Sequence, residues 1–339
     1  MMERLLEKNK RPGVCYATTR GGVELAVVDV THPGFALDID KAEQQKLLDK
    51  FLHEGMPFGG LPSPLRNLLL RFFLRGSILA GGIRKAQGGF MTGMHTYLLK
   101  LSPKMLGIAY ANHVDRKIAA SLPALGVRLR PQDMALLMAE ALLPHLQADP
   151  RRPLVFLNIA GGPAVDSLNA FIVLNKRQAG ILSGREVSIT VLDADDEGPV
   201  FGKAALAALS AADGLLHGTH VNFQHRPFDW ANANELEMAL KEAQARGSIV
   251  MCSSEGGFFK YGSDDEIVAN LKALRGHSSV VAVVGSVTRA DELTQRLRQT
   301  SGAATRPRGL EVFRELAGKA KWRVSRVVKR PFSDQVVLV

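Results

Sequence analysis

The sequence predicts an α/β protein in which a doubly wound sheet with an antiparallel last strand follows a mostly helical N-terminal region. From Leu154 onward, apolar strand-like runs alternate with helical periodicity, the pattern of a doubly wound sheet. Residues 154–160 (LVFLNIA) are apolar almost throughout, as expected for a strand buried on both faces of a parallel sheet. Only residues 329–334 join the last two predicted strands, which is too short for a parallel crossover. These two strands are therefore expected to be antiparallel.

The N-terminal part begins with a small β-hairpin. Residues 13–30 predict it, because β-prone runs flank a turn at Arg20-Gly21-Gly22. Helical periodicity follows, and we expect Pro131 to begin the last helix, where its missing N–H costs little. The predicted helices cover residues 40–53, 64–74, 91–101, 103–107, 109–121 and 131–147.

A polar, proline-containing linker at residues 148–153 is the predicted boundary between two parts of the chain. It divides a helical N-terminal or lid region, residues 1–148, from a sheet domain, residues 154–339. The strands predicted in the second part are 154–160, 187–192, 220–223, 248–252, 280–284, 323–328 and 335–339. The predicted helices are 164–178, 199–212, 233–246, 263–275, 289–299 and 309–319.

Positive charge is concentrated in one part of this basic chain, whose net charge is +10. Residues 51–130 hold eleven Lys and Arg against two acidic residues. Such a segment indicates either peripheral contact with an anionic membrane surface, through residues 61–85, or the solvated basic face of helices. No nucleic-acid partner is expected, because no DNA- or RNA-binding module is recognisable.

The remaining composition favours a cytoplasmic globular protein. The two cysteines, Cys15 and Cys252, form neither a disulfide framework nor a metal-ligand cluster. The first residues lack the apolar core of a signal peptide. Arginines interrupt the most apolar stretch, residues 61–83, so we do not expect it to span a membrane.

The sharpest local signal is the glycine-rich turn that follows the first strand of the sheet domain. It extends from Asn158 through Gly161 and Gly162 into the next helix. Glycines there let the backbone approach a ligand closely, and the helix N-terminus offers free N–H groups to an anion. The alternative is a tight strand–helix turn that binds nothing.

This turn resembles the glycine-rich motif of class I S-adenosylmethionine-dependent methyltransferases, which have a Rossmann-like fold. In that family an acidic residue and a turn often written GGGPG end the first strand. Gly161, Gly162 and Pro163 match, whereas Asn158 stands where the acid usually is. Alanines replace two of the glycines, at positions 160 and 164. The resemblance covers about residues 154–339 and implies S-adenosylmethionine as the cofactor.

An acidic residue ends the second strand of the sheet domain. Asp193 is placed there to accept hydrogen bonds from ribose hydroxyls, and the resemblance implies this role for the acid directly after the strand. Asp193 lies 32 residues after Gly161, more than the roughly 20 residues of the dinucleotide-binding fingerprint. The alternative is an acidic residue that only favours the N-terminus of the next helix.

Two later segments supply further candidate residues. Phe228 follows the third strand, where the family borders the adenine, and is a candidate stacking partner with a core role as the alternative. Ser253 and Glu255 follow the fourth strand beside two glycines, which suits an active-site loop. Glu255 is a candidate general base or hydrogen-bond partner, and Tyr261 a candidate for orienting the acceptor. Otherwise Glu255 only caps the next helix.

The resemblance implies methyl transfer to a small-molecule acceptor, with Glu255 and Tyr261 as catalytic candidates and no metal. The candidate cofactor-binding residues are Asn158, Ala160, Gly161, Gly162, Pro163, Asp193, Ala194, Phe228 and Ser253. The candidates for an acceptor pocket in the N-terminal region are Met91, Met94, His95, Tyr97, Tyr110 and His113.

Two alternatives stay open. An NAD(P)-dependent oxidoreductase would share the Rossmann pattern and Asp193 but would lack its G-x-G-x-x-G signature. A non-catalytic Rossmann module would dock to an anionic surface through residues 61–85. The signatures of phosphate-binding loops, serine hydrolases and zinc proteases are missing from the sequence. The apolar N-terminal helices also allow a homodimer.

Overall fold

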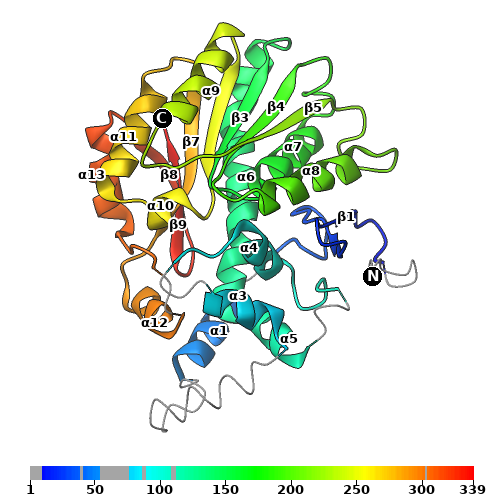
Figure 1. Ribbon diagram of the computed structural model, residues 1–339, viewed down its shortest axis with the longest axis vertical. Helices are drawn as coiled ribbons and strands as arrows, with labels where there is room; N and C mark the ends of the chain where they lie inside the picture. The colour runs from blue at the N-terminus through cyan, green and yellow to red at the C-terminus, as the bar shows by residue number, and fades with distance from the viewer. Residues whose placement is uncertain (1–9, 39–40, 54–75, 86–88, 108–111, 302–303) are drawn as a thin grey trace.

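The computed structural model describes residues 10–38, 41–53, 76–85, 89–107, 112–301 and 304–339. A seven-stranded sheet of order β5-β4-β3-β6-β7-β9-β8 forms its centre (Figure 1). The strands are β3 (Leu154–Ile159), β4 (Val187–Leu192), β5 (Val221–Arg226), β6 (Ile249–Ser254), β7 (Val280–Thr288), β8 (Val324–Lys329) and β9 (Ser333–Leu338). The predicted α/β class is confirmed.

Strands β3 to β7 are parallel, and β9 runs antiparallel to both of its neighbours. The predicted antiparallel last strand is therefore confirmed, and β9 lies between β7 and β8. The chain winds outward from β3 to β5 on one side and from β6 on the other. The point where the winding reverses is between β3 and β6, and open α/β sheets bind ligands outside the strands' carboxyl ends at this point.

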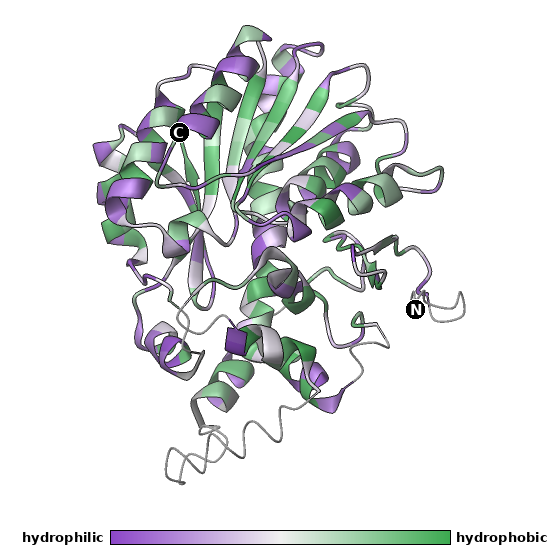
Figure 2. Cartoon of the chain, viewed as in Figure 1, coloured by the Kyte–Doolittle hydropathy of each residue, from purple (hydrophilic) through white to green (hydrophobic). Residues whose placement is uncertain are grey.

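Helices cover both faces of the sheet because alternate strand residues point to opposite sides. Phe156 of β3 faces a layer of α6 (Leu122–Ala148), α7 (Val165–Arg177) and α8 (Glu197–Ser210), where its ring meets Phe171 at 4.6 Å. Val155 and Leu157 face α9 (Asn234–Ala245), α11 (Asp264–Arg275) and α13 (Gly309–Lys319). Figure 2 shows the resulting apolar interior of the sheet between helices with mixed surfaces. Full burial of each large apolar side chain is worth roughly 1.5–3 kcal/mol.

The N-terminal region packs below the sheet in the view of Figure 1. The predicted hairpin is confirmed as an antiparallel pair of short strands, β1 (Tyr16–Thr18) and β2 (Glu24–Ala26). The helices are α1 (Lys41–His53), α3 (Ile78–Lys85), α4 (Gly93–Lys100) and α5 (His113–Ala119), and α12 (Glu292–Ser301) lies near α1. One apolar core contains residues of this region and of the sheet. The division of the chain at residues 148–154 stays a prediction.

Two predicted helices differ from the structure. Residues 103–107 form a turn, in which Met105 N donates to Ser102 O at 2.8 Å. The predicted helix start at Pro131 is wrong, because α6 begins at Leu122 with Ser121 as its N-cap. Apolar residues before and after the proline are buried, and their burial outweighs the roughly 3 kcal/mol that an internal proline costs.

Part of the predicted basic segment lies outside the described residues. The predicted helix at 64–74 and most of the segment 61–85 lie there, as does the pocket candidate Tyr110. Of the segment 61–85, Arg84 and Lys85 are described, and both are exposed at the end of α3. Among the helices that the structure describes, none combines the length and the apolar character needed to cross a bilayer. Contact of this segment with a membrane surface stays a prediction.

The turn between β8 and β9 is attached to α6 by a buried carboxylate. Arg330 donates from two nitrogens to Asp133, at 2.8 and 2.9 Å, and Asp133 is only 3% exposed. We expect Arg330→Met to lower the free energy of unfolding by about 2 kcal/mol, because the Asp133 charge stays buried without a partner. Arg326→Met on the same hairpin removes an exposed pair with Glu140 and should change stability by about 0.5 kcal/mol or less. Equal effects in urea denaturation would contradict this assignment.

Candidate functional site

The glycine-rich turn at the carboxyl end of β3 has an unusual backbone. Gly162 has φ of 56°, and the two alanines that replace glycines are also left-handed, with φ of 52° at Ala160 and 53° at Ala164. This conformation costs an alanine roughly 1–2 kcal/mol. The turn therefore keeps the backbone that glycines adopt without strain, although two of its glycines are replaced.

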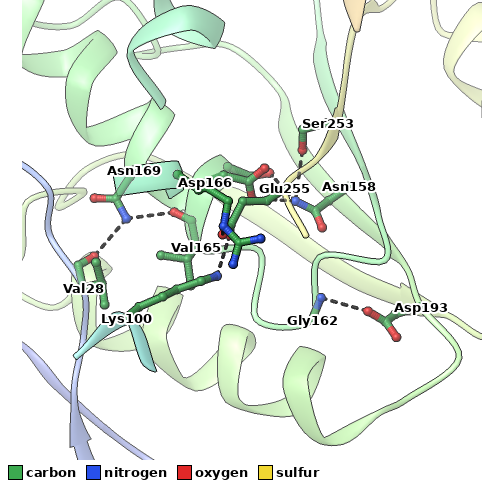
Figure 3. A network of polar contacts seen from close by, with 12 residues as sticks. Val28, Lys100, Asn158, Gly162, Val165, Asp166, Asn169, Asp193, Ser253 and Glu255 are labelled. Atoms are coloured by element: carbon green, nitrogen blue, oxygen red, sulfur yellow. Dashed lines mark hydrogen bonds and ion pairs between the residues drawn. The ribbon is translucent and has the colours of Figure 1, made fainter. Parts of the chain in front are cut away.

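Asp193 holds this turn from the end of β4 (Figure 3). Gly162 N donates to its Oδ2 at 2.9 Å, and Asp195 N donates to Oδ1 at 3.0 Å. Burial raises the pKa of Asp193, and these backbone hydrogen bonds oppose the rise. Since each carboxylate oxygen has two lone pairs, Asp193 can still accept two further hydrogen bonds.

Close backbone contacts between three glycines join the turn to α4 and to α8. Gly93 begins α4, and Gly198 lies in the first turn of α8. A Cβ atom at Gly162 would lie 2.7 Å from Gly93 Cα, and a Cβ atom at Gly198 would lie 2.7 Å from Gly162 Cα. Because real Cβ atoms do not approach backbone atoms this closely, only glycine allows α4 to pack directly on the turn.

Asn158, which stands in place of the family's acid, is fully buried and organises a polar network. Its Nδ2 lies 2.7 Å from Asp166 Oδ1, 2.9 Å from Ser167 Oγ and 3.1 Å from Ser253 Oγ. Burial, followed by the charge of Glu255, raises the pKa of Asp166 to about 6. Asn158 Oδ1 and Asp166 Oδ2 have no hydrogen-bond partner among the described residues.

Glu255 follows β6 and lies within a cluster of buried charges. Its Oε2 is 2.5 Å from Lys100 Nζ of α4, and its Oε1 is 3.9 Å from Arg130 Nε of α6. Lys260 is on the short helix α10 (Phe258–Tyr261), and burial together with the charge of Arg130 lowers its pKa well below the ordinary value. The Glu255 carboxylate is therefore engaged by cations and is not a free base in this conformation.

The aromatic candidates have different environments. Phe228 is 4% exposed and belongs to the apolar core between the sheet and α9. Tyr261 is partly buried, and burial raises its pKa. Its ring meets Phe90 at 4.9 Å, and Phe90 meets Trp230 at 5.6 Å. Ala194 is exposed beside Asp193. The functional roles of these residues stay predictions.

The N-terminal candidates that the structure describes have different environments. Tyr97 is buried, donates to Ala26 O at 2.5 Å and accepts from Val28 N. Burial lowers the pKa of His95, whose ring bonds to Thr92 at 2.7 Å, and His113 is exposed. Met91 and Met94 pack against the core.

Sequence reasoning missed four charged residues of the site: Lys100, Arg130, Asp166 and Lys260. Lys100 and Arg130 had an available signal, since both belong to the basic segment 51–130. Asp166 lies within the glycine-rich segment itself. Their convergence on Glu255 depends on packing between α4, α6 and α10, which no local pattern encodes.

Two cavities among the described residues lie away from Asp193 and Glu255. One has a volume of about 10 Å³ and lies between Tyr97, Pro163 and Asn169. The other is an open groove of about 260 Å³ between Leu37, Gln132 and Leu136. The turn after β3 is covered by the start of α4, and Glu255 after β6 is buried, whereas Ala194 after β4 is exposed.

Comparison with known proteins finds similarity only among solved structures, since no family model and no curated protein sequence matches the chain. Magnesium protoporphyrin IX methyltransferase (ChlM) from Synechocystis PCC 6803 with bound SAH is 14% identical over 64% of this chain and 86% of its own, with a TM-score of 0.41. A variant of LepI, in complex with SAH and a substrate analogue, is 12% identical over 88% and 94%, with a TM-score of 0.44.

A third structure, the pyocyanin biosynthetic protein PhzM, is 16% identical over 89% of this chain and 73% of its own, with a TM-score of 0.39. The structurally similar chains thus include S-adenosylmethionine-dependent methyltransferases. With identities of 12 to 16% and TM-scores of 0.39 to 0.44, these three similarities assign neither a family nor an activity to this chain.

The contact between α4 and the turn can be tested by two glycine substitutions. We expect Gly162→Ala to lower the free energy of unfolding by more than about 2 kcal/mol, because it adds backbone strain and a clash with Gly93. Gly180 also has a positive φ, 76°, but nothing lies within 4 Å of its missing Cβ. Gly180→Ala should therefore cost only about 1 kcal/mol. Indistinguishable denaturation midpoints for the two variants would refute the close contact.

The buried Asp166 predicts a dependence of stability on pH. Its pKa rises on folding from 3.8 to about 6, so the folded state binds the proton more tightly than the unfolded state. The stabilisation is complete below pH 4 and is lost as the pH rises to 6, by roughly 3 kcal/mol in all. Asp166→Asn should flatten the unfolding free energy across this window, while exposed Asp213→Asn should keep the wild-type slope. A wild-type slope in Asp166→Asn would show that other groups cause it.

Proposed function

We propose that this chain is an S-adenosylmethionine-dependent methyltransferase that acts on a small-molecule acceptor. The observation that carries the proposal is the left-handed turn from Ala160 to Ala164, held by Asp193 at the carboxyl edge of a doubly wound sheet. Strained backbone of this kind persists only where the surrounding structure maintains it, and it concentrates at ligand-binding sites. The sequence resemblance of this turn to the methyltransferase motif supports the same function.

The hydrogen-bonding groups at this turn match those of S-adenosylmethionine. The lone pairs of Asp193 that remain free suit the two ribose hydroxyls, and the first N–H groups of α7 suit a carboxylate. Bound there, the cofactor would supply a methyl group on a positively charged sulfur. Since Gly93 packs on Gly162, a ligand that contacts the turn from this side must displace the start of α4.

The chain's own contribution to such a reaction is positioning and exclusion of water. Methyl transfer is an in-line displacement, whose rate depends on holding donor and acceptor in contact and in line. α4 covers the carboxyl edge, where it shields the site from solvent. Glu255 would accept a proton from an acceptor only after its ion pair with Lys100 opens.

One observation favours a second candidate, the non-catalytic Rossmann module. The start of α4 packs on the turn after β3, and the two cavities described above lie away from Asp193 and Glu255. A module of this kind would need no movement of α4 and would bind no nucleotide. The oxidoreductase alternative loses support, because antiparallel β9 departs from the dinucleotide-binding fold.

Isothermal titration of the full chain with S-adenosylmethionine tests the proposal. We expect saturable binding that Asp193→Asn weakens at least about tenfold, since the variant removes one acceptor and the charge. Asp196→Asn is the matched control, because Asp196 lies three residues on and forms an exposed pair with Arg20. It should leave the affinity unchanged.

The same titration separates the candidates. Binding of S-adenosylmethionine that Asp193→Asn leaves unaffected would refute the assigned site. Binding of NADH alone would favour the oxidoreductase, and binding of neither would favour the non-catalytic module. Hydrogen exchange gives an independent readout, because displacement of α4 should speed exchange over residues 93–100 when the cofactor binds.

A further inference from the structure

Four elements bring three basic side chains around Glu255 at the switch point of the sheet. Lys100, Arg130 and Glu255 have side chains that are 3%, 4% and 2% exposed. Lys260 of α10 is the third basic side chain, and burial and the charges of the other three residues influence its pKa. Figure 3 shows Lys100, Glu255 and the neighbouring Asp166 pointing into one polar region.

The cluster contains more basic than acidic side chains. If all three basic side chains were charged, they would face two carboxylates, Glu255 and Asp166, and one positive charge would be in excess. Burial and the charges of Arg130 and Lys100 therefore lower the pKa of Lys260. The Arg130 guanidinium has a long ion pair with Glu255, at 3.9 Å, and its buried Nε and Nη1 make no hydrogen bond with the described residues. Among the described residues Lys260 forms no ion pair, and only the charge of Glu255 opposes the lowering of its pKa. Buried polar groups are almost always hydrogen-bonded in native proteins, so a buried guanidinium with two nitrogens that make no hydrogen bond needs an explanation.

Three aromatic side chains, Tyr261, Phe90 and Trp230, form a contiguous group next to these basic residues. Tyr261 directly follows Lys260, and the charge of Arg130 influences its pKa. Phe90 packs edge to face between Tyr261 and Trp230, yet it is 59% exposed. An exposed aromatic ring between two others offers a flat apolar surface to a ligand.

We propose that the acceptor of the proposed reaction is an aromatic carboxylate. Its carboxylate binds Arg130 and Lys260, and its ring lies against Phe90, Trp230 and Tyr261. One monoanion neutralises the excess charge, and the guanidinium matches a carboxylate with two parallel hydrogen bonds. The lowered pKa of Lys260 agrees with this, because a bound anion would restore its charged form. That this ligand is the methyl acceptor rests on the proposed function, but the anion site has its own test.

Sodium benzoate and its uncharged analogue benzamide are the probes. We expect benzoate to bind the full chain in isothermal titration and benzamide to bind at least about tenfold more weakly, as for loss of a charged hydrogen bond. Arg130→Gln should weaken benzoate binding at least about tenfold and leave benzamide unaffected. Lys241→Met, at a side chain that is 70% exposed, is the control and should bind benzoate like the wild type.

Arg130→Lys is a control for a folding defect, because it keeps the positive charge but cannot form two parallel hydrogen bonds with a carboxylate. Circular dichroism should show that both Arg130 variants are folded. In the titration, the affinity for benzoate should fall from the wild type to Arg130→Lys and further to Arg130→Gln. Equal binding of benzoate and benzamide, or an Arg130→Gln affinity equal to the wild type, would overturn the proposal. Loss of the affinity order in folded variants would do the same.

The cofactor's own carboxylate is the competing source of an anion. Benzoate should therefore bind equally well with and without saturating S-adenosylmethionine, and competition between the two would overturn the acceptor assignment. Failure of the proposed function looks different. In that case S-adenosylmethionine does not bind at all, while benzoate still distinguishes wild type from Arg130→Gln.

Discussion

The contact of Gly93, Gly162 and Gly198 is the constraint on which the rest of the site depends. It lets α4 lie directly on the turn after β3, and this placement carries Lys100 into the space beside Glu255. A single Cβ atom at Gly162 would separate the two backbones, since it would lie 2.7 Å from Gly93 Cα. The buried ion pair between Lys100 and Glu255 therefore depends on the backbone packing between α4 and the turn.

Burial of charge at the switch point has a consequence for function. Removing one partner from a buried ion pair costs several kcal/mol, so Lys100 and Glu255 hold α4 closed as long as nothing replaces either charge. A ligand that carries its own anion can compete for the cations and reduce that cost. Closure over the turn and recognition of an acidic ligand thus follow from the same unbalanced cluster of Lys100, Arg130 and Lys260.

The turn itself shows how backbone geometry can persist when residue type changes. Ala160 and Ala164 occupy left-handed positions where glycine is the usual residue. Hydrogen bonds hold them there: Ala160 N donates to Leu192 O at 2.8 Å, and Asp193 accepts from Gly162 N. The surrounding contacts compensate for the strain. Substituted glycines therefore do not by themselves imply that such a turn has lost its shape.

The sequence by itself determined the α/β class, the strands near their observed positions, the antiparallel last pair, and the positions of the glycine-rich turn and of Asp193 directly after their strands. Local periodicity and short connections encode these features, because residues near in sequence fix them. Only the tertiary structure decided that β9 lies between β7 and β8, that α6 continues through Pro131, and that Lys100, Arg130 and Lys260 converge on Glu255. These depend on contacts between residues far apart in the chain, whose burial outweighs local preference.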